Sequence, residues 1–122
     1  SATPATFQDA ESTGTTYSAK IGLMYANDYG FAASPSAWTT NMSSYHSTSI
    51  RDNNWMYMGL YEWTISRNSS YSNIAFRVLT SGNLNNNSVY NINYAVRPVF
   101  YLTSSTTYVS GSGTESDPIR IN

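Results

Sequence analysis

Two aromatic-rich segments bracket a polar insert, and this arrangement restricts the fold more than any other feature of the sequence. The first anchor is Glu62-Trp63-Thr64-Ile65-Ser66-Arg67 and the second is Val96-Arg97-Pro98-Val99-Phe100. The insert between them is rich in Asn, Ser and Tyr and carries little charge. Tyr offers a large contact area with few torsions to freeze, while Asn and Ser offer adaptable hydrogen bonds. We therefore expect a fixed frame of strands that presents the insert as a binding surface.

The composition fits one small domain that works outside the cell. The chain has 122 residues, enough for one modest core. Charged residues make up 11%, well below the usual quarter of a soluble chain, whereas aromatic residues reach 15%. Cys is absent from the sequence, which excludes disulfides, thiolate metal ligands and thiol nucleophiles. Small exported eukaryotic domains more often carry disulfides, so a bacterial cell surface or a phage particle is the favoured location.

The charge pattern argues against two classes of partner. The formal net charge is −1 and the sequence has no cluster of Lys and Arg, whereas a nucleic-acid binder needs a basic stripe. No apolar run approaches the roughly 18 residues of a membrane span, so we expect no membrane contact by this fragment. The sequence starts at Ser1 instead of Met, so we expect a processed or truncated product from which a leader or anchor was removed.

The pattern along the chain predicts an arm followed by an α+β domain. Residues 1–16 are small and polar and are expected to form an N-terminal arm or linker that could carry an edge strand, with the domain at 17–122. Alternation of apolar and polar residues predicts strands near 21–25, 61–65, 74–79, 96–102 and 119–121. Turns are expected at 27–30, 81–83 and 111–113, and Pro98 is expected at a sheet edge, a bulge or a strand start.

One short helix and most of the core are expected in the first half of the domain. Ser34-Pro35 is typical of a helix start, and the spacing of Trp38, Met42 and Tyr45 places them on one face of that helix. The apolar block at 55–58, together with Trp38 and Trp63, is expected to pack in the core in preference to forming a carbohydrate platform. In the strand around Trp63, the apolar face holds Tyr61, Trp63 and Ile65, and Glu62 and Thr64 lie on the other face.

Three motifs carry a resemblance to a known family. Glu62-Trp63-Thr64, Arg77-Val78-Leu79 with Gly82 nearby, and Val96-Arg97-Pro98-Val99 resemble the C-terminal half of C-type-lectin-like folds of the formylglycine-generating-enzyme type. The span from Ile21-Gly22-Leu23-Met24-Tyr25 to Leu102, and the closing Ser110–Ile119, are also similar to a group of exported Firmicutes proteins, many with a pilin-like anchor. The resemblance covers roughly residues 20 to 122 and implies a C-type-lectin-like fold.

The departures from that family limit what the resemblance implies. Catalytic members of the formylglycine-generating type need cysteines, and this chain has none. The Glu-Pro-Asn and Gln-Pro-Asp calcium motifs of sugar-binding C-type lectins are also absent from the sequence. The scaffold further resembles the variable proteins of diversity-generating retroelements, in which Asn codons of the ligand-facing segments are mutated. That resemblance implies a hypervariable surface at 68–94; a solvated loop is the alternative.

A structural reading of the charged residues is favoured over a catalytic one. Glu62 paired with Arg67, Arg77 or Arg97 is expected to be an ion pair that ties core strands together. His46 is the single histidine, has no nucleophile motif nearby and is expected to be solvated. With one His and no Cys, a transition-metal site is not expected, and Glu115 with Asp117 lacks the spacing of a calcium loop. We therefore expect no catalytic residues, no metal and no cofactor.

The sequence as a whole favours a non-catalytic, adhesin-like recognition domain of the α+β class, with a small twisted antiparallel sheet, one or two short helices and long ordered loops. The expected ligand is an extracellular protein or a glycan. The alternative function is a structural subunit that self-assembles into an extracellular filament or pilus. Structural residues are Glu62, Trp63, Arg67 and Arg97, and the expected ligand-binding residues are Asn68, Ser69, Tyr71, Asn73, Asn83, Asn85, Asn87, Tyr90, Asn91, Asn93 and Tyr94.

Overall fold

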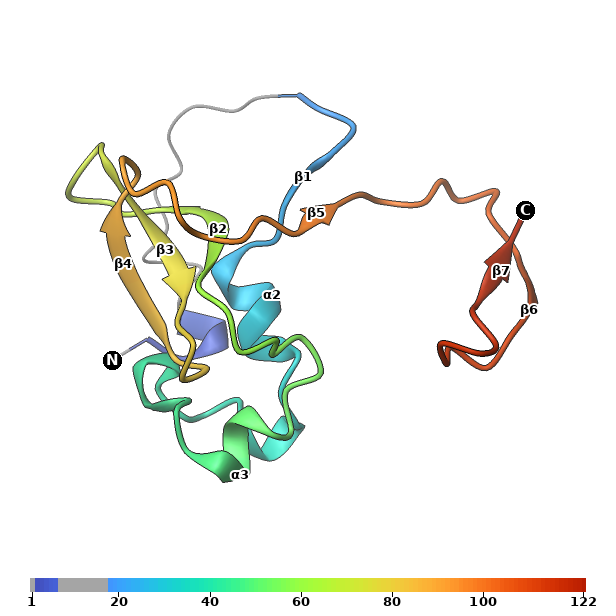
Figure 1. Cartoon of the computed structure of the whole chain (residues 1–122), viewed down its shortest axis with the longest axis horizontal. Coiled ribbons are helices and arrows are strands. Elements are labelled where there is room, and N and C mark those ends of the chain that lie inside the picture. Colours follow the sequence, from blue (N-terminus) through green and yellow to red (C-terminus); the bar gives the residue numbers. More distant parts are fainter. Residues whose placement is uncertain (1, 7–17) are drawn as a thin grey trace.

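A computed structural model describes residues 2–6 and 18–122 of the chain (Figure 1). A short first strand is followed by the helical elements and then by a series of short antiparallel strands, which confirms the expected mixed α+β class. The helical elements are α2 (Ala26–Phe31), the 3₁₀ turns η1 (Pro35–Ala37) and η2 (Met42–Ser44), and α3 (Thr48–Arg51). The strands are β1 (Gly22–Leu23), β2 (Glu62–Arg67), β3 (Ile74–Val78), β4 (Leu84–Ser88), β5 (Pro98–Val99), β6 (Tyr108–Ser110) and β7 (Arg120–Ile121).

The central element is a three-stranded antiparallel sheet in the order β2-β3-β4. The strands expected at 61–65 and 74–79 correspond to β2 and β3, and the turn expected at 81–83 joins β3 to β4. Gly82 has a φ of +92°, a conformation that other residues adopt only with strain. Its carbonyl accepts a 2.6 Å hydrogen bond from the buried Tyr29 hydroxyl, so this turn is fixed to the core.

The strand β2 turns its polar face inward, opposite to what its apolar pattern predicts. Glu62, Thr64 and Ser66 are buried, whereas Ile65 is exposed and Trp63 is only partly buried. The inward polar groups have partners, as buried polar groups require. Thr64 donates its hydroxyl to the Phe76 carbonyl at 2.8 Å, and the Ser66 hydroxyl accepts from the Ala26 amide at 2.9 Å.

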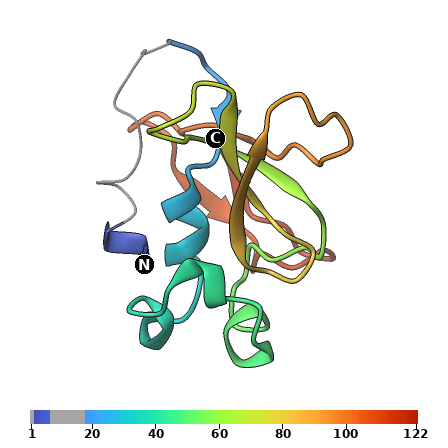
Figure 2. The same cartoon turned by 90° about the vertical axis from the view of Figure 1, so that its left-hand side faces the viewer.

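The core lies between the inner face of this sheet and α2 (Figure 2). Its largest fully buried side chains include Tyr29, Tyr45, Met24 and Met42. The two tyrosine rings are 6.5 Å apart, and the Tyr45 hydroxyl donates to the Ala37 carbonyl at 3.2 Å. Burial raises the pKa of Tyr45 to about 12 and also raises the pKa of Tyr29 above its usual range. These phenols therefore stay neutral inside the folded protein.

Two local predictions in the first half of the domain are wrong. The expected turn at 27–30 is the helix α2, because Asp28 accepts from the Tyr25 amide at 2.8 Å and closes a capping box. The expected helix after Ser34-Pro35 is instead the pair η1 and η2, separated by residues 38–41. Asn41 caps the second turn by accepting from the Ser43 amide, so the chain restarts there and does not continue as one helix.

The expected burial of the tryptophans is also wrong in part. Met56 is buried, but Trp55 is 80% exposed and Met58 is exposed as well. Trp38 is exposed and contacts Phe31 edge to face, with 5.2 Å between the ring centroids. Its indole N–H donates to the Ala33 carbonyl at 2.9 Å, so the ring is held at the surface instead of in the core.

The two ends of the chain lie differently relative to the core. Residues 4–6 form a helical turn; Pro4 is fully buried, and Ala2 accepts a 2.9 Å hydrogen bond from the Met42 amide. The first residues of the expected arm are thus part of the core, and the rest of it, with any edge strand, lies outside the described residues. The β6–β7 hairpin, in contrast, stands well away from the sheet in Figure 1.

A second small sheet joins the two halves of the domain. In it β1 pairs antiparallel with β5, with Gly22 opposite Val99 and Leu23 opposite Pro98. The structure thus places Pro98 in an edge strand, as the sequence predicts, because a proline cannot donate to a second neighbour. The expected strands at 21–25 and 96–102 are real but shorter, with two paired residues each.

Candidate ligand-binding surface

One end of the central sheet is built from two neighbouring loops that we call the sheet tip, residues 68–73 and 89–93. Because β2, β3 and β4 are antiparallel, the end of β2, the start of β3 and the end of β4 meet there. The Val89 amide donates to the Asn73 carbonyl at 3.0 Å and ties the two loops together. The sequence therefore brings residues about twenty positions apart onto one surface.

Asparagine side chains give each loop its shape. The Asn68 side-chain oxygen accepts from the Ser70 amide at 2.8 Å and from the Tyr71 amide at 3.2 Å, which forms a local turn. The Asn91 side chain donates to the Ser88 carbonyl at 3.1 Å. These two amides hold the backbone, so they are less available to a ligand than the sequence predicts. Asn73 and Asn93 are exposed, and their side chains make no hydrogen bond within the described part of the chain.

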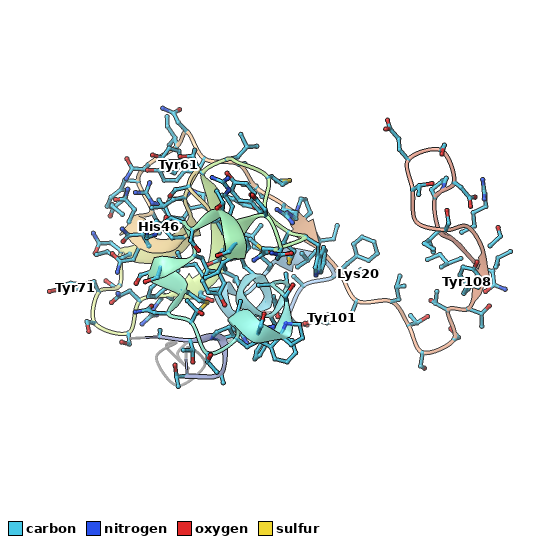
Figure 3. The ribbon with its side chains drawn as sticks, turned by 90° about the horizontal axis from the view of Figure 1, so that it is seen from below. Lys20, His46, Tyr61, Tyr71, Tyr101 and Tyr108 are labelled. Carbon is cyan, nitrogen blue, oxygen red and sulfur yellow. The ribbon has the colours of Figure 1, made fainter. Side chains whose placement is uncertain are left out.

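The tip exposes large side chains that nothing in the described structure covers. Tyr71 is 62% exposed and Tyr90 is 79% exposed, as expected for contact residues. Tyr71 projects away from the ribbon in Figure 3. Ile92 is 88% exposed and was missed by sequence reasoning. The sequence feature that could have indicated its exposure is its position between two Asn residues, without the apolar periodicity of a buried strand or helix.

Tyr94 differs from the other two tyrosines because it packs on the outer face of the sheet. Its ring lies 4.9 Å from Trp63 and 5.2 Å from Tyr61, measured between centroids. The Arg77 guanidinium carbon lies 4.7 Å from the Tyr94 ring centroid. Arg77 also donates to the Tyr94 hydroxyl, as does Asn87 at 3.0 Å. Tyr94 is therefore partly buried and acts first as a clamp, contrary to the exposed role that the sequence predicts.

This clamp fixes the tip to the sheet. After the tip, the chain crosses to the free edge of β2, where Ala95 forms a parallel bridge with Glu62. The Ala95 amide donates to the Tyr61 carbonyl at 2.7 Å, and the Trp63 amide donates to the Ala95 carbonyl at 3.0 Å. The loop 89–93 is thus held at both ends, by β4 before it and by this bridge after it.

The expected ion pair is present, and Arg97 is the partner of Glu62. The Arg97 guanidinium donates to both carboxylate oxygens of Glu62, at 2.7 Å and 2.8 Å. A third hydrogen bond, 2.6 Å long, goes to the Met56 carbonyl. The Glu62 side chain is 2% exposed and the Arg97 side chain 23%. The pair joins β2, the loop before it and the chain that leaves the tip, so its structural role is clear from the geometry.

The remaining predicted binding residues do not share one surface. Ser69 lies on the tip, but Asn83 lies in the turn at the opposite end of β4 and donates to the Ser43 carbonyl at 3.2 Å. Asn85 and Asn87 lie on the outer face of the edge strand β4, opposite Arg77 and Ala75. Arg67, which we expected to be structural, is exposed at the end of β2. The structure therefore gathers seven of the eleven predicted residues on the sheet tip.

The single histidine of the sequence, His46, lies among the described residues. His46 is exposed, as expected. Within residues 2–6 and 18–122 no group of three or more His, Cys, Asp or Glu could hold a metal ion. In the same ranges no helix is long and apolar enough to cross a membrane.

Searches of protein-family descriptions, of curated proteins and of solved structures find no match for this chain.

Proposed function

We propose that this chain is a non-catalytic, C-type-lectin-like recognition domain that binds an extracellular protein or glycan through the sheet tip. The carrying observation is that Tyr71, Tyr90 and Ile92 are largely exposed on loops whose backbones are tied to a strand frame. Rigid aromatic side chains lose little conformational entropy on binding, and preformed loops lose little more. The family resemblance of the strands that carry the tip supports the fold part of the proposal.

The setting that we propose is the exposed head of an anchored or pilin-like protein on a bacterial surface, or a phage tip. Low charge, absence of Cys and a polar, aromatic tip are consistent with that setting. Ser69, Tyr71, Asn73, Tyr90 and Asn93 would contact the ligand, since their side chains point away from the frame or lack local partners. Asn68 and Tyr94 would shape the tip instead.

If the tip is a hypervariable surface of the diversity-generating kind, its variation should fall on the residues that would contact the ligand and spare the residues that shape the tip. Sibling copies from one genome should then differ at exposed tip positions such as Tyr71 and Tyr90. They should keep Tyr94 and Arg77, because those residues hold the loop to the sheet. Substitutions spread evenly outside residues 68–94 would contradict the proposal of a hypervariable surface.

The experiment is a screen of the folded protein against a glycan array and against surface proteins of host and bacterial cells. Every hit is then measured again with Tyr71→Ser/Tyr90→Ser. We expect at least a tenfold loss of affinity with unchanged thermal melting, because both side chains are solvated in the free protein. Ile21→Ser is the matched control, since Ile21 is 63% exposed, close to the value for Tyr71, and lies outside the tip. Equal losses for the control and the tip variant would contradict the proposal.

The filament role remains the second candidate function. The observation that favours it is the β6–β7 hairpin, which stands clear of the sheet in Figure 1. Several of its apolar side chains are exposed. Ordered polymers in electron micrographs of concentrated protein would favour this role, whereas a monodisperse monomer would favour recognition alone.

A further inference from the structure

The C-terminal hairpin has an apolar face that lacks a covering in the described structure. Tyr108 pairs with Ile121 across the hairpin, so their side chains share a face, and Ile119 lies just before β7. All three side chains are exposed. A two-stranded hairpin alone is marginally stable in water, so this face needs a surface to pack on.

A complementary apolar groove lies where the hairpin segment leaves the domain. It encloses about 370 Å³ and is lined by side chains that include Met24, Phe31, Trp55, Met56, Phe100 and Tyr101. Trp55 is 80% exposed and Tyr101 is 91% exposed. Asp28 also lines the groove, and its carboxylate accepts a hydrogen bond from the Tyr25 amide. The groove is therefore a mainly apolar surface with little charge.

The connection between groove and hairpin holds the two apart within one chain. Residues 100–107 contain no Gly, and their Thr residues restrict the backbone toward extended conformations. A turn in this segment is fixed by the Thr106 amide, which donates to the Thr103 carbonyl at 3.0 Å, and by hydroxyl contacts of Thr103 with Ser105 and Thr106. Figure 3 shows Tyr108 on the hairpin, well away from Tyr101 at the edge of the domain. In this arrangement no residue of the hairpin lines the groove of its own molecule.

We propose that the groove around Trp55 receives the β6–β7 hairpin of a second copy of this chain. In a reciprocal pair each copy contributes both a groove and a hairpin, so the exposed parts of Trp55, Phe100, Tyr101 and Tyr108 offer roughly 450–750 Å² of aromatic surface per copy. That is close to the ~800 Å² per partner of a stable protein interface. Because the formal net charge of each copy is only −1, electrostatic repulsion between two copies is small. Reciprocal exchange closes a dimer, and exchange in one direction extends a chain of copies.

This inference goes beyond the proposed function and does not rest on it, because the sheet tip contributes no residue to the groove. It also supplies the filament alternative with a specific contact between subunits, in which the hairpin of one copy binds the groove of the next. Loss of ligand binding in tip variants with assembly unchanged, or the reverse, would separate the two proposals.

The test uses the absence of native Cys in the sequence. Full-length Trp55→Cys and Ile121→Cys proteins are prepared separately, mixed, and treated with a short bis-maleimide cross-linker. We expect a cross-linked pair of the two variants in at least fivefold greater yield than from Tyr90→Cys mixed with Ile121→Cys. Tyr90 matches Trp55 in exposure but lies on the sheet tip, outside the groove. Equal yields for the two mixtures would overturn the proposal.

A second arm separates exchange between copies from closure within one chain. The double variant Trp55→Cys/Ile121→Cys is cross-linked at low concentration, and its products are weighed by mass spectrometry. Interchain products that grow with protein concentration support the proposal. A cross-linked monomer whose yield does not depend on concentration shows that the hairpin folds back on its own groove, which overturns it. In sedimentation equilibrium of the cysteine-free protein, Ile121→Asp should weaken association at least tenfold; a monomer for both proteins would likewise refute docking.

Discussion

Replacing Arg97 with Ala leaves the Glu62 carboxylate in the core without its guanidinium. Glu62 is 2% exposed, so water cannot take over the two hydrogen bonds that Arg97 donates. Breaking a buried ion pair from one side costs about 3–5 kcal/mol. Loss of the bond to the Met56 carbonyl acts in the same direction. For a domain of this size, about 3–5 °C of melting temperature is lost per kcal/mol, so we expect a fall of roughly 10–20 °C.

The assay is urea unfolding of Arg97→Ala beside Arg67→Ala, followed by circular dichroism. Arg67 is exposed on the same strand frame, so its loss should change the free energy of unfolding by less than about 0.5 kcal/mol. Adding Glu62→Gln to Arg97→Ala should restore part of the lost stability, because a neutral amide costs less to bury than an unpaired carboxylate. Equal stability of the two single variants, or a further loss in the double variant, would refute the reasoning.

Three further perturbations follow from the structure. Tyr94→Ala should lower the free energy of unfolding by about 2–4 kcal/mol in urea titrations, since it removes a ring packed between aromatic side chains and the Arg77 guanidinium; a loss below 0.5 kcal/mol would contradict the clamp. Gly82→Ala should cost about 1–3 kcal/mol, because φ is +92° and the new methyl group would meet Arg51 Cγ at 2.8 Å; unchanged melting would contradict this. Burial raises the pKa of Tyr45 to about 12 and raises that of Tyr29 too, so the unfolded chain releases protons above pH 10 while the folded chain keeps them. Their stabilisation is complete below pH 10 and should fall by about 1.4 kcal/mol per pH unit and per tyrosine as pH rises from 10 to 12, in urea titrations at fixed ionic strength; a flat profile would contradict the burial.

The elements that were predictable from sequence are those where local and tertiary preferences agree. Ile74–Val78 is a strand with alternating large residues, and Gly82 supplies the turn that must follow it. The Glu62–Arg97 pair was foreseeable as one of three options, because a low-charge domain has few other partners for a buried carboxylate. The exposure of Tyr71 and Tyr90 followed from their lack of apolar periodicity.

The inverted face of β2 was not predictable from its pattern. Period-two alternation identifies two faces but does not say which face is inside when one is polar and the other aromatic. Here the polar face is inside because each of Glu62, Thr64 and Ser66 meets a partner supplied by a distant segment. The aromatic face is covered in part by Tyr94, which arrives from the end of the tip loop.

The binding surface was only partly predictable for a related reason. The sequence treats all Asn in the insert alike, yet Asn68 and Asn91 use their amides on neighbouring backbone, and Asn83 lies at the far end of β4. Which amides are free depends on loop geometry, and that geometry is set by where β4 ends. The exposure of Trp55 also depends on loop geometry, because the apolar block at 55–58 lies on a loop in which Met56 is buried, Tyr57 packs partly against the core, and Trp55 and Met58 are exposed.

The most direct test of the sheet tip as the binding surface is hydrogen–deuterium exchange of the protein with and without a binder from the screen. Bound ligand should slow exchange of amides in 69–73 and 89–93, and leave the turn at 81–83 and the segment around Trp55 unchanged. Protection centred on either of those two places, with the tip exchanging as in the free protein, would contradict the account.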